Sequence, residues 1–500
     1  MQPVSSSAPI SSAPRRLGAL ALTVMAAAVL AGCAALGDSR STQNLAEPQA
    51  QALASPQTFT NDHGQWPSQD WVDQFHDAQL RALADEAVKD NPSLQAALGR
   101  VAASRALAEA TRGALYPSVD FEGSIVRQRF SETDLFEGTP LAGSWQNQSR
   151  LQMGLSWDLD FWGKNRDALE AALSDDRAME AESQAARLIL TTSIARNYNR
   201  LAALYAQRDV AERAIAQRRD LTDLSRQRLA AGLDTQVETT QARGTVAAAQ
   251  TDLQRVEEEI ALARNQIAAL LGKGPDRGLQ IARPTLLANA TPLLPDDLTI
   301  GPIGRRPDVV AARWRVEAAS KDISVAKKEF LPDVTLTAFA GVASLDPSNL
   351  LMGISRTFGI GPSVRLPVFE GGRLRANLKG KNAQYDIAVA NYNQTLVDAL
   401  RETADTVTSI RSVDTQIKTQ REALDLAEHA YALATTRYKA GLGTQLTVLN
   451  AESNVLQQRR LATDLQARRL DLQMGLMKAL GGGYQGETPD TAQTPRAAQG

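Results

Sequence analysis

The stretch RYKAGLGTQLTVLN (residues 437–450) places Gly441 and Thr444 between two segments rich in helix-forming residues. Glycine commonly ends a helix and threonine commonly caps the next one, so this stretch predicts a tight reversal between two helices. The stretch RLAAGLDTQVETT (residues 228–240) has the same pattern, with Gly232 standing 209 positions before Gly441. The sequence therefore predicts the same reversal twice.

Other motifs repeat in the same order, which indicates that the chain is an internal duplication. The matched positions are Pro92 with Pro307 and Pro117 with Pro332, both 215 apart, then Gly163 with Gly371 and Gly272 with Gly481, 208 and 209 apart. The smaller spacing after the second pair indicates a shorter loop in the second copy. We expect a first structural repeat at residues 61–273 and a second at 303–484. A linker rich in proline and glycine, residues 274–302, joins them.

Each repeat shows one layout of predicted elements. A helix that stops before a proline (94–115 and 309–330) is followed by two strands with alternating apolar and polar residues. These strands are expected at 119–125 and 151–159 in the first copy, and at 334–339 and 360–366 in the second. Each strand, with its flanks, is long enough to cross a bilayer when tilted.

A very long helix follows the strands in each copy, at residues 166–231 and 374–440. Neither contains proline, and each would extend for about 100 Å. A returning helix then ends at Gly272 or Gly481. Apolar residues recur in steps of three and four along these helices, which predicts helices packed against each other as in a coiled coil.

The N-terminus has the features of a targeting segment. Two arginines precede a short apolar run, and LAGC (residues 30–33) resembles the lipobox of bacterial lipoproteins. Cys33 is the only cysteine of the chain, and we expect it to be acylated. Residues 1–32 would then be a signal peptide and 33–60 a lipid-anchored tether, whereas 485–500 have the composition of a disordered tail.

Several function classes are disfavoured by composition and motif content. A formal net charge of −2 does not suit an electrostatic nucleic-acid binder. His63, His76 and His429 lack the spacing of metal ligands, so they are interpreted as surface residues. The sequence contains no nucleophile–base pair and no glycine-rich phosphate loop. We therefore expect no enzyme, no cofactor and no metal.

The order of these motifs resembles the outer-membrane factor family of efflux ducts, in its lipoprotein subgroup serving resistance-nodulation-division pumps. The motifs that carry the resemblance are LAGC, NPSLQAALGRVAASRA, LYPSV, LSWDLDFWGKNR, RRPDVVAARWRVEAAS, LPVFEGGRLRA and the two reversals. The resemblance implies a mainly α fold with a membrane β-barrel portion. In it, a homotrimer builds a twelve-stranded β-barrel continued by a long α-helical tunnel. The strands alone require several chains, because four strands cannot close a barrel and open edges are not tolerated in lipid.

The family's role implies a passive duct in the cell outer membrane that conducts drugs, dyes or metals outward. Its partners would be outer-membrane lipid, a periplasmic adaptor and an inner-membrane pump. The reversals would be the adaptor-contact tips: Gly232, Leu233, Asp234, Thr235, Gly441, Leu442, Gly443 and Thr444. Family members often place an aspartate inside the tip as a periplasmic gate. Asn450 occupies that position here, with Gln241 as its counterpart, so a gate would lack charge; a solvated surface Asn is the alternative.

Two other interpretations remain open on the residues. The duct could be the exit channel of a type I polypeptide secretion system, or the chain could be a periplasmic coiled-coil adaptor or scaffold without a pore. Trp145, Trp157 and Trp162 lie near predicted strand ends. They would form either an aromatic belt at a membrane interface or part of a packed core.

Overall fold

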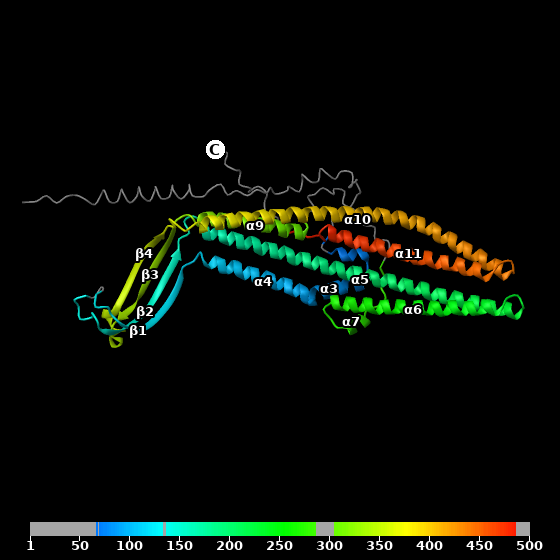
Figure 1. Cartoon of the computed structure of the whole chain (residues 1–500), viewed down its shortest axis with the longest axis horizontal. Coiled ribbons are helices and arrows are strands. Elements are labelled where there is room, and N and C mark those ends of the chain that lie inside the picture. Colours follow the sequence, from blue (N-terminus) through cyan, green and yellow to red (C-terminus); the bar gives the residue numbers. More distant parts are fainter. Residues whose placement is uncertain (1–66, 69, 134–136, 287–304, 487–500) are drawn as a thin grey trace, which may run out of the picture. The chain divides into compact units, whose positions relative to one another are not determined.

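The computed structural model describes residues 67–68, 70–133, 137–286 and 305–486 (Figure 1). The predicted signal peptide, Cys33, the tether, His63, most of the linker and most of the tail lie outside these residues. The described residues belong to two units. The first contains Ala103–Arg177 and Trp314–Ala390, and the second contains the remainder.

The first unit contains one four-stranded antiparallel sheet in the order β1-β2-β3-β4. The strands are β1 (Ser118–Arg129), β2 (Trp145–Asp158), β3 (Asp333–Ser344) and β4 (Arg356–Arg365). All four predicted strands are confirmed. All four extend further toward the loops than the apolar alternation suggested, because polar residues such as Gln128 and Gln146 still pair through their backbones. The loop is also shorter in the second copy, as predicted: 345–355 against 130–144.

The register of the sheet separates an apolar face from a more polar one. Val119, Leu155, Ala338 and Ile360 lie in one row across the four strands, and the next row holds Phe121, Met153, Ala340 and Phe358. On the opposite face Glu122, Gln152, Gly341 and Thr357 share a row. Large residues of the apolar rows are exposed: Val119, Phe121, Ile125, Met153, Phe358, Ile360 and Val364.

The helices repeat in matched pairs, in agreement with the predicted duplication. Helices α4 (Pro92–Gly113) and α9 (Pro307–Lys328) have 22 residues each, and α5 (Lys164–Ala230) and α10 (Arg373–Lys439) have 67. The returning helices α6 (Gln236–Leu270) and α11 (Gln445–Ala479) have 35. Within the described residues, none of the helices combines the length and apolar character that crossing a bilayer requires.

Helix α4 begins two residues earlier than predicted. Proline is tolerated at the first helical position, where no backbone donor is needed. Asn91 caps the helix, since its side-chain oxygen accepts from the N–H groups of Ser93 and Leu94 at 2.9 and 3.1 Å. Its amide nitrogen donates to the carbonyl of Leu270 at 2.8 Å, which fixes the end of α6 beside this cap.

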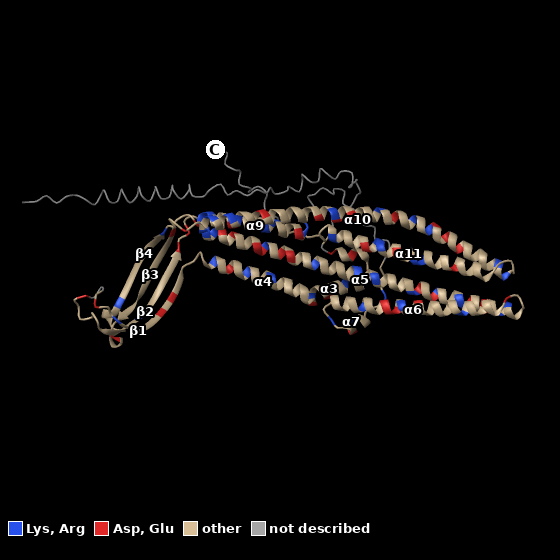
Figure 2. Ribbon diagram, in the orientation of Figure 1, with Lys and Arg blue, Asp and Glu red and all other residues tan. Residues whose placement is uncertain are grey.

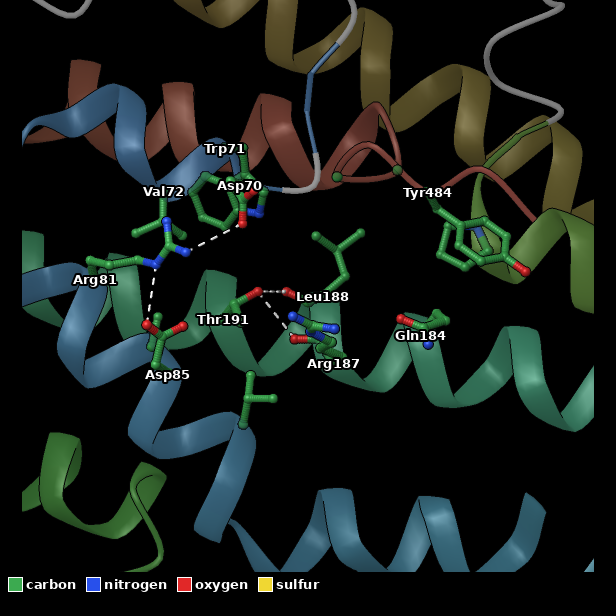
Figure 3. Close-up of a pocket in the computed structure, with 15 residues that line it drawn as sticks. Asp70, Trp71, Val72, Arg81, Asp85, Gln184, Arg187, Leu188, Thr191 and Tyr484 are labelled. Atoms are coloured by element: carbon green, nitrogen blue, oxygen red, sulfur yellow. Dashed lines mark hydrogen bonds and ion pairs between the residues drawn. The ribbon is translucent and has the colours of Figure 1, made fainter. Parts of the chain in front are cut away.

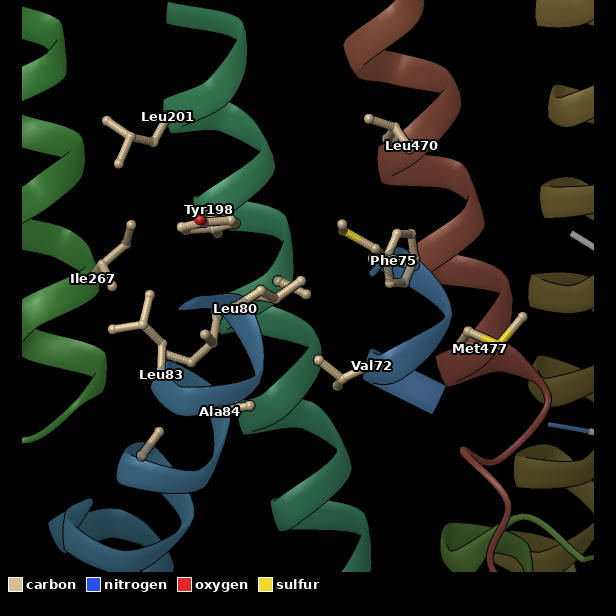
Figure 4. Packing of buried hydrophobic residues seen from close by; sticks show 14 of the residues in the cluster. Val72, Phe75, Leu80, Leu83, Ala84, Tyr198, Leu201, Ile267, Leu470 and Met477 are labelled. Carbon is tan, nitrogen blue, oxygen red and sulfur yellow. The ribbon is translucent and has the colours of Figure 1, made fainter. Parts of the chain in front are cut away.

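The main apolar core lies in the second unit (Figure 4). The 3₁₀ helix η1 (Trp71–Phe75) and helix α3 (Ala78–Asp90), neither of them predicted, pack against α5, α6 and α11. Buried side chains there include Trp71, Leu80, Leu83, Tyr198, Leu201, Ile267, Leu271 and Met477. The core therefore brings both repeats together around a short N-terminal segment.

Residues 274–286 of the expected linker are described, and they contain a short helix, α7 (Pro275–Leu279). Asp77 holds the end of this segment. Its carboxylate accepts from the N–H of Thr285 at 3.0 Å and from the hydroxyl of Tyr198 at 3.0 Å. The same carboxylate caps α3 through the N–H groups of Gln79 and Leu80. Burial alone would raise the pKa of Asp77, but these hydrogen bonds together hold it below its ordinary value.

Candidate functional site: the tips of the helical hairpins

Both hairpin tips begin with the same glycine-dependent helix end. Gly232 and Gly441 have φ of 73° and 76°, in the left-handed region that suits glycine. The N–H of Leu233 donates to the carbonyl of Arg228 at 2.9 Å, and that of Leu442 donates to Arg437 at 2.9 Å. This is the Schellman arrangement, so both glycines have a structural reason to recur.

The two threonines begin the returning helices, but their caps differ. Thr235 forms a capping box: its N–H donates to the Glu238 carboxylate at 2.8 Å, and its hydroxyl accepts from the N–H of Val237 at 3.2 Å. Thr444 accepts from the N–H of Thr447 at 3.4 Å. Because Thr447 replaces Glu238, the second tip has no carboxylate to close its cap.

The repeated glutamines have different environments. Gln236 is exposed, whereas Gln445 is buried. The Gln445 amide nitrogen donates to the hydroxyl of Ser225 and to the carbonyl of Glu238, each at 3.0 Å. Gln445 therefore joins the second hairpin to both helices of the first, a role that its recurrence in the sequence did not reveal.

A charged cluster also ties the two hairpins together. Arg228 donates to the Asp234 carboxylate through Nε at 3.0 Å and Nη2 at 3.2 Å, and through Nη1 to the carbonyl of Tyr438 at 2.9 Å. The Tyr438 hydroxyl donates to the same carboxylate. The guanidinium also stacks over the Tyr438 ring, 4.5 Å from its centroid. The Asp234 carboxylate of the first tip thus accepts hydrogen bonds from one side chain of each hairpin, Arg228 and Tyr438.

The electrostatics of this cluster follow from its burial. The side chains of Arg228 and Asp234 are 11% and 8% exposed. Burial would raise the pKa of Asp234, but the hydrogen bonds from Arg228 and Tyr438 outweigh it and hold that pKa below its ordinary value. Asp234 is therefore ionised at neutral pH and keeps its partners in place.

A second polar contact lies further along the helices and was not predicted. Arg218 of α5 donates to the Glu452 carboxylate of α11 at 3.1 Å and to the carbonyl of Thr245 of α6 at 2.9 Å. Glu452 is only 2% exposed, and burial raises its pKa despite Arg218. The sequence pattern could have predicted that Glu452 is buried, because it lies between Val448 and Val455, which are also buried, on one helical face.

The ends of the tips are apolar and exposed. Leu233 and Val237 of the first tip are 64% and 68% exposed, and Leu442 and Leu446 of the second are 72% and 57% exposed. Asn450 and Gln241 are also exposed, and neither side chain makes a hydrogen bond with the described part of the chain. Their gate role therefore stays a prediction.

The predicted aromatic residues lie in the first unit and are not in a core. Trp145, Trp157 and Trp162 are 61%, 37% and 47% exposed. The indole of Trp157 donates to the carbonyl of Leu115 at 3.1 Å, and that of Trp162 donates to Pro332 at 2.8 Å. Within the described residues none of the three belongs to a buried core, so the interfacial belt stays a prediction.

A pocket in the second unit is too small to be a route for cargo (Figure 3). It has a volume of about 70 Å³, below the range of sites for drug-sized ligands. Arg81 lies at its wall, where its guanidinium pairs with Asp70, Asp73 and Asp85. In the described ranges, no group of His, Cys, Asp or Glu side chains is placed to hold a metal ion, and this covers His76 and His429.

The family model described as outer membrane efflux protein matches residues 83–273 and 303–482. The chain belongs to this family. It is therefore an efflux protein of the outer membrane, with the duplicated, mainly α fold that the sequence predicts. The two matched blocks fall within the two predicted repeats.

Similar proteins agree with this assignment. The fusaric acid resistance protein FusA of Burkholderia cepacia is 39% identical over 376 residues, which cover 74% of this chain and 70% of that protein. The multidrug resistance outer membrane protein MdtQ of Escherichia coli O157:H7 is 29% identical, covering 91% and 96%. The outer membrane protein VceC of Vibrio cholerae has a similar structure, with a TM-score of 0.79 at 38% identity, covering 84% of this chain and 100% of that one.

Proposed function

We propose that three copies of this chain form one channel through the outer membrane, the exit duct of a tripartite efflux pump. The four-stranded sheet carries this proposal. Within the described residues β1 and β4 each pair on one side only, and unpaired strand edges are unfavourable in lipid. Pairing β4 of one copy with β1 of the next would satisfy both edges. The count of three copies, giving twelve strands, rests on the family resemblance.

The exposed apolar rows support placing the sheet in a bilayer. Phe121, Phe358 and Ile360 are 71%, 83% and 77% exposed in the single chain. Exposure of this size on one face is costly in water and favourable in lipid. The opposite face, which contains Glu122 and Gln152, would line a water-filled lumen.

The hairpin tips are the proposed docking site for a periplasmic adaptor, which would connect the duct to an inner-membrane pump. Leu233, Val237, Leu442 and Leu446 offer exposed apolar side chains on fixed turns, and such groups suit the end of a partner's helical hairpin. The Asp234 cluster and Gln445 keep the two tips together, so that a partner would meet one surface.

Asn450 and Gln241 are proposed as an uncharged constriction just inside the tips. Amide side chains can hydrogen-bond to each other across a closed mouth without a charge. A seal of this kind would depend only weakly on salt, because no charged pair is screened.

Cys33 is proposed as the lipidated N-terminus of the mature protein, which would add a lipid anchor to the membrane contacts of the sheet. The protein itself would act passively and without catalysis. By similarity to proteins named for fusaric acid resistance and multidrug resistance, small toxic organic compounds are the proposed cargo. The sheet and the family argue against a pore-less scaffold.

The experiment is a deletion strain complemented with the wild-type gene, with its tolerance to a panel of antibiotics, dyes, metals and fusaric acid measured. Wild type is expected to restore tolerance to one or more compounds and to migrate as a heat-sensitive oligomer from washed outer membranes. Leu233→Asp combined with Leu442→Asp should remove tolerance but keep the oligomer. A monomer that carbonate releases from the membrane would overturn the proposal.

A further inference from the structure

The two turns that lead from the sheet into the long helices differ sharply in charge. The first junction, residues 156–172, contains two cations and four anions; the second junction, 365–381, contains five cations and one anion. The first is therefore net negative and the second net positive, although they occupy equivalent places in the duplication. Figure 2 shows the basic residues gathered at the start of α10.

In the first junction, acidic side chains balance the partial positive charge at the start of α5. The Asp160 carboxylate accepts from the N–H groups of Asn165 and Arg166 at 2.9 and 3.1 Å. Asp167 adds an acid in the first turn, where it pairs with Lys328 at 2.6 Å. Negative charge at a helix N-terminus is favourable because the unpaired N–H groups carry partial positive charge.

The start of α10 has the opposite arrangement. Phe369 stands four residues before α10, as Asp160 does before α5, and no acid occupies the first turn of α10. Arg373, Arg375 and Lys379 are all exposed. Arg375 and Lys379 are four residues apart and so share one helical face, where like charges repel. The Lys379 side chain makes no hydrogen bond or ion pair with the described residues. Glu370, the one acid of this junction, pairs with Arg373 at 3.1 Å, and the junction stays net positive. Excess positive charge at a helix N-terminus is unfavourable, so an anion from outside would be favourable there.

An exposed apolar pair lies directly beside these cations. Val368 and Phe369 are 87% and 90% exposed. They follow β4, whose residues Ile360 and Val364 are exposed on the apolar face of the sheet. The chain thus passes from a lipid-compatible strand, through two strongly exposed apolar side chains and Glu370, to a group of cations. This order matches the order of acyl chain, interface and phosphate in a phospholipid leaflet.

We propose that the second junction is a binding surface for anionic phospholipid, with Val368 and Phe369 among the acyl chains and Arg375 and Lys379 on the headgroup phosphates. The first junction, with its own acids, has no such preference. This inference rests on the proposed function, because it needs the sheet to lie in a bilayer.

The test uses the full-length protein carrying Phe369→Trp as a reporter, reconstituted in equimolar phosphatidylethanolamine and phosphatidylglycerol. In each sample one of the two lipids carries bromine, which quenches nearby tryptophan. The same protein without the reporter gives the background from the native tryptophans. We expect phosphatidylglycerol to quench the reporter more strongly than phosphatidylethanolamine does, and high salt to reduce this preference.

Removing the cations should remove the preference. Each basic residue near an anionic surface contributes an affinity factor of about five, so Arg375→Gln with Lys379→Gln should lower the relative affinity for phosphatidylglycerol by about 25-fold. The control is Arg166→Gln with Glu170→Gln in the first junction, which removes one cation and one anion without changing the net charge, and it should leave the preference unchanged.

Three results would overturn the inference. They are equal quenching by the two lipids in wild type, an unchanged preference in the double variant, and loss of the oligomer in that variant, which would make the junction a contact between copies. Failure of the wild-type protein to insert at all would instead refute the proposed function, so the two failures are distinguishable.

Discussion

Substituting Asp234→Asn should loosen the contact between the two hairpin tips. The carboxylate accepts two hydrogen bonds from Arg228 and one from Tyr438, and the change removes its charge while keeping its shape. Breaking a fully buried pair costs about 3–5 kcal/mol and an exposed pair up to about 1 kcal/mol. Both side chains are about a tenth exposed, and Arg228 keeps its bond to the Tyr438 carbonyl, so about 2 kcal/mol is expected.

Hydrogen exchange of the tip amides measures this directly. A loss of about 2 kcal/mol corresponds to about 30-fold faster exchange in residues 225–240 and 434–450. The control is Asp223→Asn, which breaks an exposed pair with Arg226 on the same helix and should change exchange by less than about fivefold. Equal effects from the two substitutions would refute the reasoning.

The same cluster predicts how the tips respond to pH. Because the folded-state pKa of Asp234 is lowered, its stabilisation is complete above the unfolded-state pKa of about 4 and is lost as pH falls through the folded value. Wild-type exchange should therefore approach that of the Asn variant only below about pH 4. If the two proteins converge near neutral pH, another group controls the tips.

Three further predictions test other parts of the hairpins and core. Arg218→Met should cost about 3 kcal/mol because it leaves Glu452 buried and charged, whereas Glu452→Gln should cost less. Burial raises the pKa of Glu452, so the Arg218→Met penalty should shrink on acidification while the pH is still above the ordinary carboxyl pKa. Hydrogen exchange in α11 measures both effects. Gly232→Ala should destabilise the first tip by about 1 kcal/mol, because this residue has a positive φ. Gly244 lies inside α6 with open space around it, so Gly244→Ala should stabilise that helix by up to about 1 kcal/mol. The unfolding temperature should therefore fall in the first variant and rise in the second. Asp77→Ala should cost about 2 kcal/mol through the lost cap and buried partners, and limited proteolysis should then cut residues 274–286 faster than in wild type.

The periodic parts of the fold could be predicted from sequence. Alternation located all four strands, and the proline-free runs located α5 and α10 to within two residues at each end, since Gly232 and Gly441 mark the stops. Helix α3 was missed because it is separated from α4 only by Asn91, and its burial depends on distant residues such as Tyr198. A pattern within one segment carries no information about such partners.

The tips were predicted as a site, but their chemistry was not. Gly232, Thr235 and their counterparts were identified because they recur, and recurrence reflects turn geometry. The residues that join the hairpins do not recur: Asp234 aligns with Gly443 and Tyr438 with Leu229. Contacts between the copies are invisible to a comparison of one copy with the other, because they depend on where the two copies have diverged.

This divergence has a consequence for any partner that binds the tips. In the proposed trimer, three ends would carry Asp234 and Glu238, and three would carry Gly443 and Thr447. The rim would then have threefold symmetry only, with binding sites of two different charges alternating around it. Six identical binding partners would occupy two kinds of binding site. A titration should therefore resolve two dissociation constants, each belonging to half of the sites.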